Sequence, residues 1–129
     1  MAYKLSSRSR SRLSGVHPNL VKVVMRAIEL TLTDFTVLEG LRTKEKQAEY
    51  IKRGVSKTMH SKHLRQTDGF GHAVDLGPLV DGKISWEWGQ AYDDVSSAMK
   101  KAATELGLKI QWGGDWKSFK DGPHYELVP

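Results

Sequence analysis

The chain has 129 residues, of which 39% are hydrophobic and 27% charged, and its net charge at pH 7 is +5. These values are typical of one soluble globular domain with a single hydrophobic core. The absence of cysteine excludes disulfides, thiolate catalysis and cysteine-based zinc sites, and no apolar run approaches the about 20 residues of a membrane-spanning helix. The positive charge favours an anionic partner, such as nucleic acid, a membrane surface or an anionic cell wall.

Residues 1–14 are predicted to form a flexible basic arm, because Arg8, Arg10 and Arg12 alternate with serine. No apolar core follows this basic start, so the segment does not resemble a secretory signal peptide. We therefore expect the protein to be made and held in the cytoplasm.

Hydrophobic periodicity, capping residues and glycines predict the elements of the first two thirds of the chain. Apolar residues at helical spacing follow Pro18, and an alternating β-branched stretch follows Asp34. Thr43 has the side chain of a helix cap, and Gly54 is a stop signal. The expected elements are a helix over 18–31, a strand over 34–40, a helix over 43–54, a polar loop over 56–71 and a buried strand over 72–80.

The last third is predicted to hold the longest helix, capped by Ser85 and ended by Gly107. A strand over 108–112, a tight turn over 113–116 and a final strand over 123–127 follow. Because helices and strands do not alternate strictly, the expected fold class is α+β. The apolar positions of the long helix are expected at Trp88, Tyr92, Val95, Met99, Ala102 and Leu106.

Two histidines and two aspartates far apart in the chain are candidates for a hydrolytic centre. If Asp75 ends a central strand, His63 from the preceding loop and His124 from the last strand can reach it. Two imidazoles and one carboxylate are a recurring catalytic zinc set with one position left for water, although manganese or cobalt accept similar ligands. Asp121 is a candidate general base, and Arg42 is a candidate oxyanion group. The alternative interpretation is a polar surface loop.

Three further histidines are weighed against this set. His60 lies in the same loop as His63 and is the alternative first ligand. His72 is less suited, because strand alternation places it on the other face from Asp75. His17 precedes a proline and is expected to cap or pack at a helix start.

The motifs "SKH" (61–63), "GHAVD" (71–75) and "DGPHYEL" (121–127) occur in this order. They resemble the Ser-x-His, Gly-x-Ala-x-Asp and acid-x-x-His pattern of the zinc D-Ala-D-Ala carboxypeptidases and dipeptidases. That group includes the phage L-alanyl-D-glutamate peptidases and shares its fold with the Hedgehog signalling domain. "GVHPNL", "FTVLEGLRT" and "WGGDW" also resemble the phage endolysin branch, so the likeness extends from about Gly15 to Leu127.

The resemblance implies a small antiparallel sheet flanked by helices, a bound Zn²⁺ and a role for each matching residue. The implied roles are zinc ligand for His63, Asp75 and His124, catalytic acid/base for Asp121, contact with the scissile carbonyl or a substrate carboxylate for Arg42, and a supporting or substrate-contacting role for Ser61.

One departure from the family pattern concerns the first ligand. Eleven residues separate His63 from Asp75, whereas the short form of the pattern has six. "RQTDG" (65–69) is interpreted as a five-residue insertion that a loop absorbs at little entropic cost. The insertion leaves His60 open as the alternative.

Weaker expectations concern the surroundings of the centre. Glu126 lies two residues beyond His124 and is expected to hold a ligand in place. Asp115 and Trp116 are weaker candidates for substrate contact. The four tryptophans, Trp86, Trp88, Trp112 and Trp116, are more typical of a core than of a sugar platform, with Trp112 and Trp116 expected beside the cleft.

The expected function is a monomeric zinc peptidase of the endolysin type that cuts the L-alanyl-D-glutamate bond of peptidoglycan stem peptides. It would wait in the host cytoplasm until it is released to the cell wall. Alternatives are a D,D-carboxypeptidase or dipeptidase of the same fold and a non-catalytic, metal-containing wall-binding module. No nucleic-acid-binding motif accompanies the arginines, and no stable membrane insertion is expected.

Overall fold

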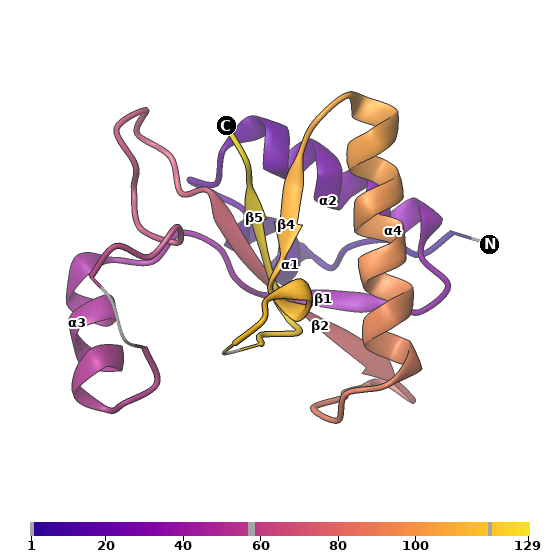
Figure 1. Ribbon diagram of the computed structural model, residues 1–129. Helices are drawn as coiled ribbons and strands as arrows, with labels where there is room; N and C mark the ends of the chain where they lie inside the picture. Colours follow the sequence, from indigo (N-terminus) through magenta and orange to yellow (C-terminus); the bar gives the residue numbers. More distant parts are fainter. Residues whose placement is uncertain (1, 57–58, 119) are drawn as a thin grey trace.

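A computed structural model describes residues 2–56, 59–118 and 120–129 (Figure 1). The helices are α1 (Ser7–Arg12), α2 (Pro18–Leu30), α3 (Lys44–Lys52) and α4 (Gln90–Leu106), and a 3₁₀ turn, η1, spans Gly113–Asp115. The strands are β1 (Phe35–Glu39), β2 (Ala73–Val80), β3 (Lys83–Ile84), β4 (Ile110–Trp112) and β5 (His124–Leu127). The sheet is antiparallel with the order β1-β2-β5-β4, and β3 pairs with β2. The predicted α+β class is confirmed.

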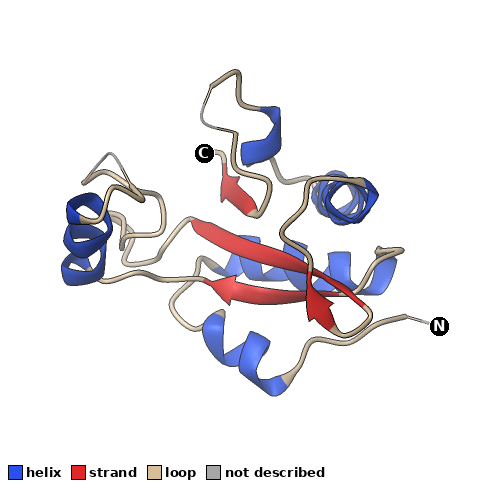
Figure 2. Cartoon of the chain, turned by 90° about the horizontal axis from the view of Figure 1, so that it is seen from below, coloured by secondary structure: helices blue, strands red, loops and turns tan. Residues whose placement is uncertain are grey.

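One face of the sheet packs on the core, and the opposite face is left for the site. Val74 and Leu76 of β2 and Tyr125 of β5 are buried in a cluster with the apolar faces of α2 and α4. Because strand side chains alternate, the intervening Asp75 and His124 point to the other face. Helix α3 and the loop after it lie at the side of the sheet remote from α4 (Figures 1 and 2). None of the described helices is long and apolar enough to cross a membrane.

Local sequence signals set most element ends. The imidazole of His17 caps α2 by accepting a hydrogen bond from the Asn19 N–H, and the hydroxyl of Thr43 caps α3. Gly107 ends α4 in the left-handed conformation, with φ of 69°. The predicted start of α4 at Ser85 is wrong: the Ser85 N–H bonds to the Pro78 carbonyl in the β2–β3 hairpin, and the helix begins only after Gly89.

The predicted flexible arm is also wrong for the residues that form α1. The Ser9 hydroxyl accepts a hydrogen bond from the Val37 N–H at 2.9 Å, and the Arg12 guanidinium donates to the Val37 carbonyl at 3.0 Å. Leu5 and Leu13, on either side of the helix, are buried. Side chains of α1 therefore satisfy backbone groups at the otherwise unpaired edge of β1, which orders the segment.

Replacement of Ser9 by alanine should lower the free energy of unfolding by about 1–3 kcal/mol, because it leaves the buried Val37 N–H without a partner. Chemical denaturation measures this loss. Ser11→Ala, at an exposed position of the same helix, is the control and should change stability by less than about 0.5 kcal/mol. Equal unfolding midpoints for the two variants would contradict the role of α1.

Candidate metal centre

Strand register brings Asp75 and His124 together. Asp75 of β2 lies directly opposite His124 of β5, and opposite Glu39 of β1 on its other side. Directly opposite residues share one face of a sheet, so these side chains lie together on the face away from the core. His63 reaches the same place from the loop, whose path is held by the hydrogen bond from the Arg42 N–H to the His63 carbonyl at 2.8 Å.

Three donor atoms converge on a common point. The Asp75 Oδ1 atom lies 3.1 Å from His63 Nε2 and 3.3 Å from His124 Nδ1. A tetrahedral zinc ion with bonds of about 2.0–2.1 Å has ligand atoms about 3.3 Å apart. The spacing of these three donors therefore fits a metal ion of this size, and His63, Asp75 and His124 form one candidate metal-binding group.

The second nitrogen of each imidazole faces a hydrogen-bond acceptor. His63 Nδ1 lies 2.9 Å from the Gly40 carbonyl oxygen, and His124 Nε2 lies 2.9 Å from Glu126 Oε1. Each of these nitrogens is placed to donate its N–H, so in the neutral imidazole the lone pair of the other nitrogen is directed at the shared point. Metal-binding histidines are usually oriented in this way. Glu126 lies on the predicted side and holds His124.

Asp121 lines the same hollow as the three donors. Its N–H bonds to the Gly113 carbonyl at 3.0 Å, and its carbonyl accepts from the His124 N–H at 3.2 Å. A Cβ atom at Gly113 would clash with the Asp121 carbonyl oxygen, so the glycine of η1 permits this close approach. Burial, and then the charge of Asp75, raise the pKa of Asp121, which makes its carboxylate a better proton acceptor.

The guanidinium of Arg42 is held in a buried polar network beside the three donors. Its Nε donates to Glu39 Oε1 at 2.9 Å, its Nη1 donates to Gln47 Oε1 at 2.7 Å, and its Nη2 lies 4.0 Å from Asp75 Oδ2. Burial raises the pKa of Glu39, but the hydrogen bond and charge of Arg42 outweigh burial and lower it. Sequence reasoning missed Glu39, because a spacing of three residues predicts a side-chain pair within a helix, whereas Glu39 ends β1.

A hollow of about 920 Å³ surrounds these groups. The Trp116 ring lies 5.0 Å from the His124 ring, and the Ser61 hydroxyl accepts a hydrogen bond from the His63 N–H at 3.2 Å. Trp86, expected in the core, is 68% exposed and lines the hollow, so that expectation is wrong. Sequence reasoning also missed Lys46 and Tyr50 of α3 and Arg53 at its C-terminal end, all of which line the hollow.

Several predicted residues lie elsewhere. Asp115 pairs with Lys100 at 2.8 Å and does not line the hollow, so its predicted substrate contact is not supported. Trp112 is buried and donates from its indole to the Gly122 carbonyl at 2.7 Å, so it supports the loop that holds Asp121. His60 lines the hollow but does not belong to the group of three donors. Trp88 precedes α4 and is 52% exposed, so its predicted places in that helix and in the core are wrong.

The metal-free centre should hold an extra proton on His124. Burial lowers the pKa of His124, but its hydrogen bonds with Asp75 and Glu126 outweigh burial and raise the pKa to about 9. Since this exceeds the unfolded value of about 6.5, the proton stabilises the metal-free fold fully below about pH 6.5, and the stabilisation is lost as the pH rises through 9.

Zinc binding at pH 7.5 should therefore release about one proton from His124, because a metal ion needs the Nδ1 lone pair. Calorimetric titration in two buffers of different ionisation enthalpy measures the release as a difference in heat. Glu126→Gln should release fewer protons, since it weakens one of the hydrogen bonds that raise the pKa of His124. Identical heats for the unmodified protein in both buffers would contradict the protonated state.

Comparison with known proteins agrees with this geometry. The family model of the phage L-alanyl-D-glutamate peptidases matches residues 1–128. The chain is 36% identical to the L-alanyl-D-glutamate peptidase of Escherichia phage T5, over 99% of this chain and 100% of that one. It is 31% identical to the peptidoglycan L-alanyl-D-glutamate endopeptidase CwlK of Bacillus subtilis strain 168, over 90% of this chain and 75% of that one.

A solved structure is also similar. The crystal structure of the Serratia marcescens L-Ala D-Glu endopeptidase ChiX aligns with a TM-score of 0.87 and 41% identity, over 98% of this chain and 91% of that one. The fold and the matched family define an α+β peptidase. The chain belongs to the phage L-alanyl-D-glutamate peptidase family, which confirms the family predicted from its motifs.

Proposed function

We propose that the protein is a zinc-dependent endopeptidase that hydrolyses the L-alanyl-D-glutamate bond of peptidoglycan stem peptides. The observation that carries this proposal is the convergence of His63 Nε2, Asp75 Oδ1 and His124 Nδ1, each imidazole being fixed by its other nitrogen. Relatives named for cleavage of this bond align over nearly the whole chain and support the choice of bond.

The residues around the donors have distinct tasks in this reaction. A zinc ion supplies Lewis acidity when it is bound between the three ligands. The Asp121 carboxylate takes a proton from the attacking water and returns it to the leaving amine. The Arg42 guanidinium faces the same hollow and stabilises negative charge on the scissile carbonyl oxygen or on a substrate carboxylate.

Alongside its carboxylates, the hollow offers four cationic side chains that can bind the carboxylates of an anionic peptide. Lys46, Arg53 and Lys62 line it together with Arg42, and a stem peptide that contains D-glutamate carries carboxylates. The net charge of +5 also favours approach to anionic wall polymers. Because one chain supplies all the ligands, we propose that the protein acts as a monomer on the wall after release from the host cytoplasm.

Digestion of purified peptidoglycan tests the proposal. The metal-free protein and His124→Ala should release no new amino groups, and added zinc should restore activity to the former alone. Mass spectrometry of the stem peptides should show a cut after L-alanine. Loss of terminal D-alanine would instead indicate a D,D-carboxypeptidase, and wall binding without any cut would indicate a binding module. Equal hydrolysis with and without chelator would refute the zinc assignment.

A further inference from the structure

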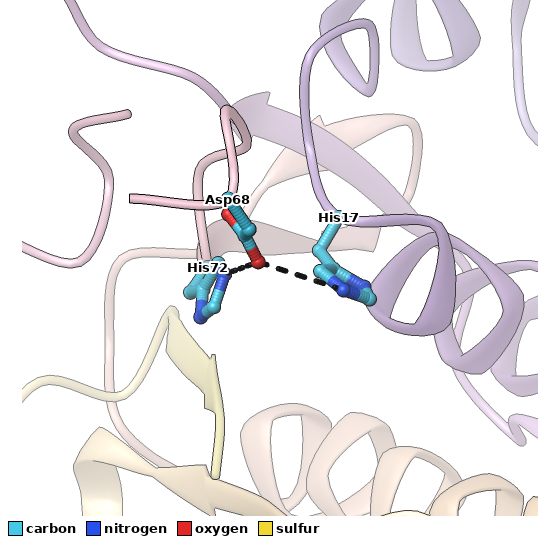
Figure 3. Close-up of side chains that lie close together, drawn as sticks. All are labelled: His17, Asp68 and His72. Atoms are coloured by element: carbon cyan, nitrogen blue, oxygen red, sulfur yellow. Dashed lines mark hydrogen bonds and ion pairs between the residues drawn. The ribbon is translucent and has the colours of Figure 1, made fainter. Parts of the chain in front are cut away.

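A second group of metal-ligating side chains lies outside the hollow. His17, Asp68 and His72 come from the N-terminal cap of α2, the inserted loop and the residue before β2. In Figure 3 their side chains point toward one another. Their donor atoms all lie within 4.8 Å of one another, as do those of the first group. Two imidazoles and a carboxylate thus recur at a second place in the chain.

The carboxylate of Asp68 is shared between the two imidazoles. Its Oδ2 lies 2.7 Å from His72 Nε2 and 3.7 Å from His17 Nε2, and its Oδ1 accepts a hydrogen bond from the Phe70 N–H. That hydrogen bond, the largest cause, and then the hydrogen bond with His72 lower the pKa of Asp68, whose carboxyl group is ionised at neutral pH. The carboxylate is therefore oriented and charged as a metal ligand must be.

Backbone hydrogen bonds hold the three segments in place. The Gly71 N–H bonds to the Gly15 carbonyl, and the His17 N–H bonds to the Gly71 carbonyl, each at 2.9 Å. The Gln66 N–H donates a hydrogen bond to the Phe70 carbonyl at 2.8 Å, which closes the loop. Little rearrangement is needed to bring the donors to a common ion. All three side chains are partly exposed, so an ion and its waters have access.

We propose that His17, Asp68 and His72 form a second binding site for a divalent metal ion of the zinc, cobalt and nickel type. Paired imidazoles with one carboxylate select such ions over magnesium or calcium, which prefer oxygen ligands alone. The site lies against α2 and the start of β2, whereas the first site lies in the hollow. The role of the second ion is to clamp the inserted loop to the folded core.

The second site is expected to bind a metal ion more weakly than the first, because of the hydrogen bond that His17 already makes. His17 Nδ1 accepts from the Asn19 N–H, so its neutral form carries a proton on Nε2, which faces Asp68. Coordination through Nε2 moves the proton to Nδ1 and gives up this helix cap. In the first site both imidazoles already face acceptors. Loss of such outer support weakens metal binding by about 10–100-fold, which sets the expected order of affinities.

The clamp acts on the segment that carries His63. The His72 N–H bonds to the Lys62 carbonyl at 2.7 Å, next to His63, and Asp75 follows His72 by three residues. A metal ion at the second site therefore restrains both ends of the segment between His63 and Asp75, the first two ligands of the first site. It stabilises the folded state by mass action, since the unfolded chain does not hold the three donors together.

Metal stoichiometry tests this inference separately from the proposed function. Metal-free protein is titrated with zinc by calorimetry and with cobalt by absorption. We expect two equivalents for the unmodified protein, one for Asp68→Asn, one for His124→Ala and none for the double variant. Asp81→Asn removes a charge in an exposed turn and is the matched control, with two equivalents expected.

His17→Asn provides a variant that protects the fold, because asparagine can still cap α2. It should weaken the second binding event at least tenfold and leave the first unchanged. Zinc should also raise the melting temperature of His124→Ala but not that of Asp68→Asn/His124→Ala. The second site would be overturned if Asp68→Asn and His17→Asn each still bound two equivalents of metal. It would also be overturned if the unmodified protein bound a single equivalent and Asp68→Asn still bound it. If the first site in the hollow alone failed to bind metal, the unmodified protein would bind one equivalent and Asp68→Asn would bind none.

Discussion

Asp121→Asn is expected to lower kcat by about 10²–10⁴-fold while the protein keeps its metal. Asparagine has nearly the same shape as aspartate but cannot accept a proton from water. The backbone hydrogen bonds of Asp121 with Gly113 and His124 do not involve the carboxylate, so the turn should fold normally. Initial rates of stem-peptide cleavage, measured beside metal content, separate this loss from loss of the ion.

Asp115→Asn is the matched control for that experiment. Asp115 lies six residues before Asp121 but pairs with Lys100 and does not line the hollow. Its substitution should leave kcat within about twofold, a change of about 0.4 kcal/mol in the barrier. A similar loss in both variants would mean that the segment acts through its structure, and full activity of Asp121→Asn would remove the proposed proton acceptor.

Arg42→Ala is expected to lower the free energy of unfolding by about 3–5 kcal/mol, as removal of one partner of a buried ion pair commonly does. The side chains of Arg42 and Glu39 are 9% and 14% exposed, and Arg42 also donates a hydrogen bond to the side-chain oxygen of Gln47. Without the guanidinium, the ion pair left to the Glu39 carboxylate among the described residues is the one with the more exposed Lys46, at 3.2 Å. Chemical denaturation of the metal-free protein measures the loss without a contribution from the ion.

Two variants make the stability measurement specific. Arg53→Ala removes an exposed arginine whose ion pair with Glu49 is 3.7 Å long, and it should cost less than about 0.5 kcal/mol. Glu39→Gln combined with Arg42→Ala should be more stable than Arg42→Ala alone, because no uncompensated charge stays buried. If Arg42→Ala and Arg53→Ala unfold at the same midpoint, the network has no structural role.

The kinds of metal-binding and proton-accepting groups at the candidate site could be predicted, because they are properties of single side chains. The order of "SKH", "GHAVD" and "DGPHYEL" made His63, Asp75, His124 and Asp121 candidates through its resemblance to a family pattern, with His60 left open as the alternative first ligand. Alternation along β2 correctly put His72 apart from Asp75. Helix α2 was predictable because its apolar period and the cap at His17 are local.

The errors have a common cause, since each depends on a contact with a distant segment. Helix α1 has the composition of a solvated arm, and it is ordered by bonds from Ser9 and Arg12 to Val37. Ser85 has a capping side chain, but its backbone N–H donates a hydrogen bond to the Pro78 carbonyl in a hairpin. Such contacts leave no trace in local periodicity.

The sequence by itself determined the fold class, the family and the kinds of donor atom available, because periodicity and side-chain chemistry are local. Only the tertiary structure decided which histidines meet which aspartates. Strand register sets His124 opposite Asp75, and the pairing of Gly71 with Gly15 and His17 brings Asp68 and His72 to the start of α2. Distances between residues far apart in the chain follow from such backbone pairing.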